Sequence, residues 1–294
     1  MKIDREWCEK VFHTVAPKGP LVTDYVAVSY AFHWVRHNID DYRGFIHERV
    51  IQPHRYFVES LEYVQTYNTL LHIWDQPRGY SGDGGLLQKM YDCFELPDGH
   101  PYVKTCWDNF ICGKPEFLAV QHRKIMFQEQ LDQMIDAGAK SLVDLGCGNG
   151  WYTEYAWQRF VNTGVPFGEV IGIDKEFPPP TSSPHPLWVE ANVLKKLPEY
   201  QCDIVYSGGL FDYFTDGIFS KMLARIQQFE PKFIMIGNID QSSYTKSMLE
   251  CLGWYLFDRS RWDLLELTIP HTSWAWCVKT DITKRQHFLI GRAT

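Results

Sequence analysis

The sequence has no run of about 18 uninterrupted apolar residues, so it offers no segment suited to spanning a membrane. Its first ten residues, MKIDREWCEK, carry charges where a signal peptide would need an apolar core. These two absences predict a cytoplasmic protein with no membrane partner.

A cysteine framework is also missing. The eight cysteines form no Cys-x-x-Cys pair and no regular spacing, and several of them, such as Cys251, stand inside apolar runs. Reduced, buried thiols are therefore expected, and no metal site is predicted.

Positive charge is in deficit, because 36 acidic residues outnumber 29 lysines and arginines and give a formal charge of −7. Nucleic-acid phosphates favour a basic face, so a nucleic-acid substrate is not expected.

Apolar residues, by contrast, make up 45% of the chain and aromatic residues 15%, which predicts a globular protein with a substantial core. This aromatic content admits an aromatic-lined pocket, with ordinary core use as the default for most of the rings.

A glycine-rich turn organises the second half of the chain, in the string SLVDLGCGNG at residues 141–150. Residues 141–145 have the pattern of a short apolar strand, and residues 151–160 that of a helix without a breaker. Glycine at three alternate positions lets the backbone turn sharply and lets a ligand approach the main chain. Strand, turn and helix start predict a nucleotide site; taken alone, a tight turn without a ligand is the alternative.

An acid ends the next apolar strand, residues 169–173. This acid is Asp174, 24 positions after Gly150 (174 − 150). There it can accept hydrogen bonds from ribose hydroxyls, which favours the nucleotide site over the plain turn.

The spacing Gly-x-Gly-x-Gly, with an Asp two residues before the first glycine, resembles motif I of class I S-adenosylmethionine-dependent methyltransferases more than the dehydrogenase fingerprint. In that family the motif I acid and glycines hold the methionine part of the cofactor, and the second acid holds the ribose. An Asn or Asp after the third strand contacts adenine. The resemblance implies S-adenosylmethionine as cofactor, bound by Asp144, Gly146, Gly148, Asn149, Gly150, Asp174, Asn192, Val193, Ser207, Gly208 and Arg123.

Arg123 stands on the helix predicted over residues 114–137, which leads into the first strand. Its guanidinium fork is well shaped for the carboxylate of the methionine tail. An arginine exposed on a solvated helix face is the alternative, and the neighbouring His122 has the same status.

Strands and helices alternate from residue 141 onward, which implies an α/β fold with a mainly parallel, doubly wound sheet. Class I methyltransferases end in an antiparallel pair, so the resemblance implies a seven-stranded Rossmann-like methyltransferase sheet. Beyond the first two strands, the expected strands are 187–190, 202–207 and 232–238, with a closing hairpin at 274–280 and 287–291.

Residues 1–115 lack this alternation and show helix-like stretches broken by Pro and Gly, one of them over residues 55–74. The predicted organisation is an N-terminal helical cap and substrate region at 1–115, followed by an S-adenosylmethionine-binding Rossmann-like domain at 116–294. The glycine loop at residues 79–85 is either a lid over a ligand or a plain surface connection.

The string YSGGLFDYF, residues 206–214, stands where open α/β sheets bind ligands. Together with residues 247–267 it resembles a bacterial subgroup of class I methyltransferases with GLxDYL and WYLxYR segments. This resemblance covers roughly the last 150 residues. The expected context is bacterial secondary metabolism, that is, natural product biosynthesis. The chain departs from it at Asp258, where the subgroup has Tyr, so the substrate is left open.

The leading functional hypothesis is methyl transfer to a small-molecule acceptor, a carboxylate, amine or hydroxyl, by holding the reacting atoms in line. The alternative is cyclisation of the cofactor itself to azetidine-2-carboxylate and methylthioadenosine, a reaction of some bacterial natural-product enzymes with a methyltransferase-like fold. A cofactor-binding scaffold without catalysis is disfavoured because motif I and the ribose acid are intact. The acceptor and the oligomeric state are left open, and the candidate catalytic residues are Tyr213, Asp212, Tyr80, Tyr25 and Tyr30.

Overall fold

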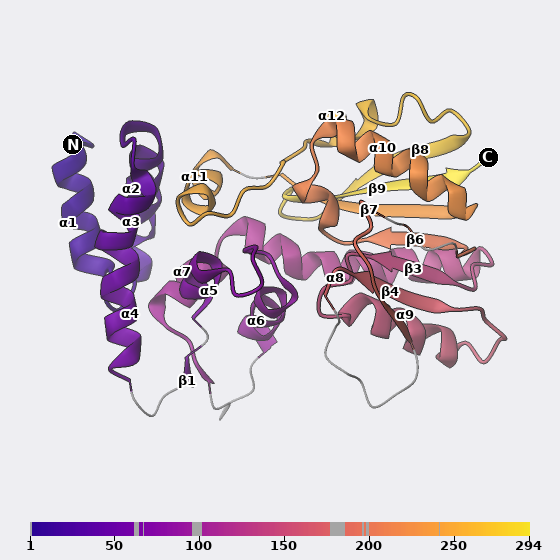
Figure 1. Cartoon of the computed structure of the whole chain (residues 1–294), viewed down its shortest axis with the longest axis horizontal. Coiled ribbons are helices and arrows are strands. Elements are labelled where there is room, and N and C mark those ends of the chain that lie inside the picture. The colour runs from indigo at the N-terminus through magenta and orange to yellow at the C-terminus, as the bar shows by residue number, and fades with distance from the viewer. Residues whose placement is uncertain are drawn as a thin grey trace. The chain divides into compact units, whose positions relative to one another are not determined.

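A computed structural model describes residues 2–61, 65–66, 68–95, 102–176, 186–195, 197, 200–240 and 242–294. The chain divides into two compact units, labelled by element in Figure 1. The first unit comprises Met1–Leu118 and Gln241–Tyr255, and the second comprises Ala119–Asp240 and Leu256–Thr294. The sequence led us to expect a division at residue 115, with residues 241–255 in the C-terminal domain. In the structure these residues belong to the first unit.

The second unit is built on one seven-stranded sheet, in the order β5-β4-β3-β6-β7-β9-β8. The first five of these strands are parallel, and β9 pairs antiparallel with both β7 and β8. The predicted α/β sheet with a closing antiparallel hairpin is therefore confirmed. The strands are β3 (Leu142–Leu145), β4 (Val170–Asp174), β5 (Leu187–Glu190), β6 (Ile204–Ser207), β7 (Phe233–Ile239), β8 (Trp274–Thr280) and β9 (Gln286–Ala293).

Both faces of this sheet are covered, as the continuous apolar character of its central strands requires. On one face Val205 belongs to an apolar core with Phe219 of α10 (Asp216–Ile226). On the other face the Tyr206 ring lies 4.4 Å from the ring of Phe127 on α8 (Pro115–Asp136). Successive strand residues point to opposite faces, so one dipeptide of β6 contacts both helical layers.

The strand order reverses between β3 and β6, because the chain runs from β3 outward to β5 and then returns to β6 on the other side. At such a switch point the loops at the carboxyl ends of the two strands separate, and open α/β sheets bind ligands there. The glycine turn follows β3, and the YSGGLFDYF segment contains the last two residues of β6 and the loop after it, so both predicted loops lie at this position (Figure 1).

The first unit is helical, with a buried centre around Trp107, whose ring lies 6.3 Å from that of Phe32 and 5.7 Å from that of Phe110. Residues 65–66 and 102–103 form a short parallel pair, β1 (Gln65–Thr66) and β2 (Tyr102–Val103). The helices are α1 (Arg5–Val15), α2 (Tyr25–Asn38), α3 (Tyr42–Ile46), α4 (Gln52–Glu59), α5 (Thr69–Asp75), α6 (Gly84–Glu95), α7 (Cys106–Cys112), α11 (Ser243–Cys251) and the start of α8.

The single helix predicted over residues 55–74 is wrong. Helix α4 ends at Glu59, and α5 begins only at Thr69. Asn68, directly before α5, has a φ of 50°, the left-handed conformation that a continuous right-handed helix excludes. Residues 62–64 and 67 of the predicted helix lie outside the described residues.

Residues 241–255 leave the second unit after β7 and place α11 against α2 in the first unit. Arg36 of α2 donates from Nε to Glu250 of α11 at 2.6 Å, and His33 Nδ1 lies 2.9 Å from Ser247 Oγ. In the part of the chain that the structure describes, no helix is both long enough and apolar enough to cross a membrane.

Candidate functional site

The glycine turn after β3 is built as the sequence predicts. Gly146, Gly148 and Gly150 have φ values of +72°, +57° and +79°, which side chains rarely adopt. The main-chain N–H of Gly146 donates to the carbonyl of Ile173 at 2.7 Å, so the turn is bound to the end of β4. Helix α9 (Trp151–Asn162) begins directly after it, and its first N–H groups therefore stand at the turn.

Packing also requires glycine at two of these positions. A Cβ atom on Gly146 would lie 2.8 Å from Cβ of Leu210, and one on Gly150 would lie 2.5 Å from Cη2 of Trp188. The third glycine thus serves the close contact between α9 and the sheet, as it does in other glycine-rich strand–helix turns.

Asp174 is brought to this turn and is only 7% exposed. Its Oδ2 accepts a hydrogen bond from the main-chain N–H of Gly148 at 2.9 Å, and its Oδ1 accepts one from Glu176 N at 3.2 Å. Because each carboxylate oxygen can accept more than one hydrogen bond, the group keeps capacity for two hydroxyls.

Asp144, at the end of β3, is 1% exposed. Its Oδ2 accepts from Thr153 Oγ1 of α9 at 2.8 Å, whereas its Oδ1 has no hydrogen-bond partner among the described residues. Burial raises the pKa of the Asp144 carboxyl to about 7. A buried oxygen without a partner is costly, and a ligand proton would satisfy it. Sequence reasoning missed Thr153, which reads as an ordinary helical residue.

Arg123 is buried, with 4% exposure, so the alternative of an arginine on a solvated face is wrong. Its Nε donates to Tyr152 Oη of α9 at 2.9 Å, and its Nη1 donates to the carbonyl of Gly208 at 2.9 Å. A Cβ atom on the next residue, Gly209, would lie 2.8 Å from the same Nη1. The guanidinium therefore joins α8, α9 and the loop after β6.

The loop after β6 leads into the short helix η3 (Leu210–Tyr213). Ser207, before the loop, donates from Oγ to the carbonyl of Leu145 at 2.9 Å and so joins the ends of β6 and β3. Asp212 accepts on Oδ1 from the N–H of Ile239 at 2.9 Å, which joins η3 to the end of β7. Burial raises the pKa of the Asp212 carboxyl to about 7. Tyr213 is partly buried and packs against the apolar core on the α10 side.

Arg259 fixes η3 and the residue after it through hydrogen bonds, and this positioning role was not anticipated from the sequence. Its side chain is 3% exposed, and its Nη1 donates to Asn238 Oδ1 at 2.8 Å while its Nη2 donates to the carbonyl of Phe214. Its Nε donates to Asp216 at 2.9 Å. The available signal was the arginine of the WYLxYR-like segment, which positions the turn through main-chain carbonyls.

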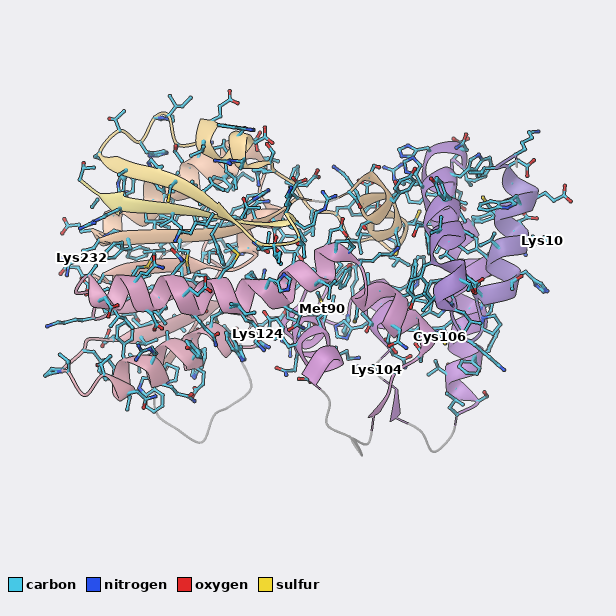
Figure 2. The ribbon with its side chains drawn as sticks, turned by 180° about the vertical axis from the view of Figure 1, so that it is seen from behind. Lys10, Met90, Lys104, Cys106, Lys124 and Lys232 are labelled. Atoms are coloured by element: carbon cyan, nitrogen blue, oxygen red, sulfur yellow. The ribbon has the colours of Figure 1, made fainter. Side chains whose placement is uncertain are left out.

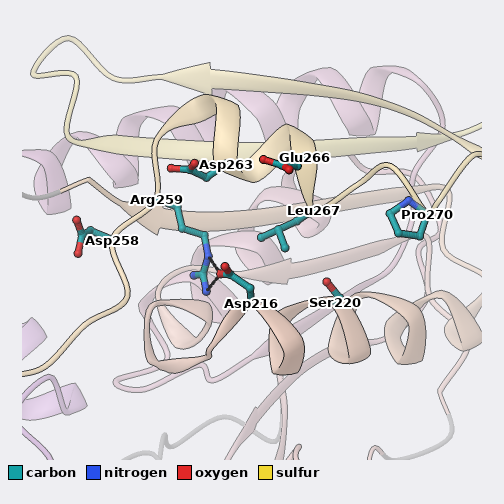
Figure 3. Close-up of a pocket in the computed structure, with 8 residues that line it drawn as sticks. All are labelled: Asp216, Ser220, Asp258, Arg259, Asp263, Glu266, Leu267 and Pro270. Carbon is teal, nitrogen blue, oxygen red and sulfur yellow. Dashed lines mark hydrogen bonds and ion pairs between the residues drawn. The ribbon is translucent and has the colours of Figure 1, made fainter.

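A cavity of about 340 Å³ lies beside Arg259, between α10 and α12 (Arg261–Glu266) (Figure 3). None of the residues expected to bind the cofactor lines it. The lining residues are Asp216, Ser220, Asp258, Arg259, Asp263, Glu266, Leu267 and Pro270.

The remaining cofactor-binding candidates make local contacts. Asn149 Oδ1 accepts from Trp151 N at 3.3 Å, and Asn192 Oδ1 accepts from Leu194 N at 3.0 Å. Val193 is buried, at 5% exposure. Both asparagines therefore stabilise turns at the carboxyl edge of the sheet.

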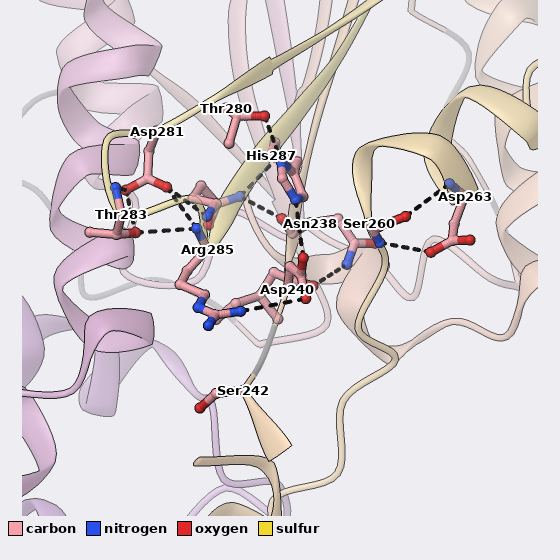
Figure 4. Close-up of polar contacts among 12 residues, drawn as sticks. Asn238, Asp240, Ser242, Ser260, Asp263, Thr280, Asp281, Thr283, Arg285 and His287 are labelled. Atoms are coloured by element: carbon pink, nitrogen blue, oxygen red, sulfur yellow. Dashed lines mark hydrogen bonds and ion pairs between the residues drawn. The ribbon is translucent and has the colours of Figure 1, made fainter. Parts of the chain in front are cut away.

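A second polar network joins the ends of β7, β8 and β9 (Figure 4). His287 is 4% exposed, with Nδ1 at 2.8 Å from Thr280 Oγ1 and Nε2 at 3.6 Å from Asp240 Oδ2. Burial lowers the pKa of His287, which favours the neutral ring. His122, a candidate on α8, lies with Nδ1 3.0 Å from Asp281 Oδ2 at the edge of this network.

The three tyrosine candidates of the first unit do not form one cluster in the described contacts. The Tyr25 ring packs edge-on against Phe110, at 4.9 Å, and the Tyr30 ring against Tyr244, also at 4.9 Å. Tyr80 stands in the turn that precedes α6. Within the described ranges, no group of three or more His, Cys, Asp or Glu side chains could hold a metal ion.

No protein-family model matches the sequence, and no curated protein matches it. A structure of a possible exported protein from Bordetella parapertussis resembles the chain with a TM-score of 0.53 and 11% identity, over 77% of this chain and 87% of that one. At this identity the likeness concerns the fold alone.

Two methyltransferase structures resemble the chain with lower scores. Magnesium protoporphyrin IX methyltransferase from Synechocystis PCC 6803 has a TM-score of 0.45 and 11% identity, over 60% of this chain and 84% of that one. A 1,6-didemethyltoxoflavin-N1-methyltransferase from Burkholderia thailandensis has a TM-score of 0.43 and 16% identity, over 60% and 78%.

Proposed function

We propose that the chain is an S-adenosylmethionine-dependent enzyme that methylates a small-molecule acceptor. The observation that carries this proposal is the joined pair at the sheet edge, in which the N–H of Gly148 donates to the carboxylate of Asp174 at 2.9 Å. A glycine turn at a helix start and an acid at the next strand's end are what a nucleoside with a charged tail requires.

In this proposal Asp174 accepts hydrogen bonds from the ribose hydroxyls of the cofactor. The main chain at Gly146 and Gly148 lies against the methionine part of the cofactor. The unpartnered Oδ1 of Asp144 accepts a hydrogen bond from the ligand or from a bound water. Asn192 and Val193, which follow the end of β5, contact the adenine of the cofactor.

Arg123 acts mainly by positioning. Its bonds to Gly208 and Tyr152 hold the loop after β6 against the start of α9, so the two loops of the site keep a constant spacing. A planar guanidinium with several fixed donors suits this task, which a lysine could not reproduce.

When bound, S-adenosylmethionine supplies an electrophilic methyl group, and the chain's work is to orient the acceptor and exclude water. Asp212 is the candidate proton acceptor near the site, because its pKa of about 7 allows exchange near neutral pH. A carboxylate acceptor would need no such group. Tyr213, Tyr25, Tyr30 and Tyr80 remain candidates for contact with the reacting groups, with residues 1–115 as the substrate region.

The finer parts of this proposal are a cytoplasmic location and a role in bacterial secondary metabolism. Neither part is needed for the cofactor assignment.

Calorimetric titration of the full chain with S-adenosylmethionine, followed by mass analysis of the mixture, tests the proposal. We expect saturable binding, and methylated product with S-adenosylhomocysteine once an acceptor is added. Absence of binding would reject it. Methylthioadenosine formed from the cofactor alone would replace methyl transfer by the cyclisation reaction.

A further inference from the structure

The carboxyl-terminal half of α2, in the first unit, carries two histidines one helical turn apart, His33 and His37. Residues four apart on a helix lie on the same face, and the centres of these two imidazole rings are 4.6 Å apart. His37 is exposed and His33 is partly buried, so the pair is open to solvent. Neither histidine belongs to the proposed cofactor site.

Helix α11 adds a third polar atom to this pair. Ser247 Oγ lies 2.9 Å from His33 Nδ1 and 3.5 Å from His37 Nε2. The Ser247 hydroxyl donates to the carbonyl of Ser243 at 2.8 Å, so the lone pairs of its oxygen face the two imidazoles. Two ring nitrogens and one oxygen, supplied by two helices, therefore converge at one place in the first unit.

The spacing of these three atoms is close to that of ligands around a zinc ion. Zinc binds nitrogen and oxygen at about 2.0–2.2 Å, so at tetrahedral angles two such ligands lie about 3.3–3.5 Å apart. His37 Nε2 already has this separation from the hydroxyl oxygen, and His33 Nδ1 must move outward by only about 0.4 Å. Histidines four apart on one helix face are also the pair that helical zinc motifs use.

Both nitrogens can present a lone pair to a metal ion. His33 Nε2 and His37 Nδ1 have no hydrogen-bond partner among the described residues, so each neutral ring can carry its proton on that other nitrogen. The positive charge of Arg36, between them in sequence, is paired with Glu250 of α11 at 2.6 Å. The carboxyl end of α2 carries the negative end of the helix dipole, which favours a cation.

We propose that His33, His37 and Ser247 bind a zinc ion through the two imidazole nitrogens and the hydroxyl oxygen. Two imidazoles are fewer strong ligands than a structural zinc site has, so water completes the coordination and the affinity is moderate. Because its ligands come from both α2 and α11, the ion joins residues 241–255 to the N-terminal helices and stabilises the first unit. The site does not depend on the proposed methyl transfer.

Calorimetric titration of the metal-free full chain with zinc chloride at neutral pH tests the site. Every protein carries Cys277→Ser, because this exposed thiol could bind zinc by itself. The variants His33→Ala and His37→Ala each remove one imidazole. The matched control is His13→Ala, which removes an exposed histidine from α1, the helix that carries Lys10 in Figure 2.

A fourth variant, Ser247→Cys, tests the position of the third ligand. Cysteine is close to serine in size, and a thiolate is a much stronger zinc ligand than a hydroxyl. Sulfur at this position would complete a set of two imidazoles and one thiolate, so we expect zinc to bind at least about tenfold more tightly.

We expect the parent and His13→Ala to bind one zinc ion per chain with equal affinity. His33→Ala and His37→Ala should each lose at least about tenfold, because a single imidazole cannot chelate. Zinc should also raise the midpoint of urea unfolding of the parent and leave that of His37→Ala unchanged. Magnesium, which prefers oxygen ligands, should not compete.

Circular dichroism checks that each variant is folded, and His37→Ala changes an exposed side chain, so its fold should be intact. The inference is overturned if the parent does not bind zinc, or if folded His37→Ala binds it as the parent does. An unchanged affinity in folded Ser247→Cys would equally reject the site, because the two nitrogens would then not share a metal ion beside residue 247.

Discussion

The ends of β3 and β4 carry acids that look equivalent in the sequence and differ in the structure. Asp174 has both carboxylate oxygens bonded to main-chain N–H groups, at 2.9 and 3.2 Å. Asp144 has one oxygen bonded to Thr153 and the other buried without a partner, and its pKa is raised to about 7. The carboxylate of Asp174 is thus oriented by main-chain hydrogen bonds. Asp144 keeps a buried oxygen without a partner, to which a ligand can donate a hydrogen bond.

The largest loss of cofactor binding is expected from Gly148→Val, because the N–H of this glycine joins the turn after β3 to the end of β4. A branched side chain at a φ of +57° would displace the N–H that bonds Asp174 and would fill the space in which a ligand meets the main chain. Cofactor binding should fall below detection in calorimetry.

The control for this variant is Gly164→Val, which imposes similar backbone strain at a φ of +65° in the turn after α9. Both proteins should keep their circular dichroism spectra. Unchanged affinity in a folded Gly148 variant would show that the turn serves only the fold.

Asp174→Ala should weaken S-adenosylmethionine binding by about ten- to a hundredfold, since losing a charged acceptor for hydroxyls costs roughly 1.5–3 kcal/mol. The same titration on Asp203→Ala, an acid outside the proposed site, provides the comparison. If the Asp174 variant binds as the parent does, β4 does not carry the ribose acid.

Asp144→Asn should change how stability depends on pH. The carboxyl has a pKa of 3.8 in the unfolded chain and about 7 in the folded one, so between these values the folded protein holds a proton that the unfolded chain releases. The free energy of unfolding therefore falls as pH rises through this window and is level above it.

Urea unfolding at several pH values across this window measures how steeply the free energy of unfolding falls with pH. The Asn variant should reduce this slope. Asp212 has a pKa raised in the same direction, so Asp212→Asn is the matched variant and part of the slope should remain in each. An unaltered slope in Asp144→Asn would place its carboxyl in an ordinary, ionised state.

The smallest effect is expected from Trp188→Phe on β5. The Trp188 ring fills the space over Gly150 and Gly172, while its Nε1 is buried without a hydrogen-bond partner among the described residues. Phenylalanine loses ring contacts but removes the unpartnered donor, so the unfolding free energy should change by less than about 1 kcal/mol. A much larger loss in urea unfolding would indicate that Nε1 has a partner, such as a bound water.

The strands β3, β4, β6 and β7 were predictable because they are short apolar runs bounded by glycine or a polar residue. The predicted strand at 187–190 coincides with β5, and the run at 232–238 differs from β7 by one residue at each end. The helix predicted over 55–74 failed because the left-handed backbone at Asn68 has no signature in an apolar pattern.

For the candidate site, sequence reasoning reached the residues whose role depends on local spacing. The glycines adopt positive φ, and Asp174 lies at the turn. It did not reach Thr153 or Arg259, since a helical threonine or a loop arginine carries no local sign of the partner that it will meet.

The sequence by itself determined the strand–turn–helix at residues 141–160, because glycine conformation and apolar runs act between near neighbours in the chain. Only the tertiary structure decided that Arg123 is buried against Gly208, that Asp144 keeps one oxygen unpartnered, and that residues 241–255 pack with the first unit. Each of these depends on contacts between segments far apart in sequence, where burial and the supply of hydrogen-bond partners are set by the assembled fold.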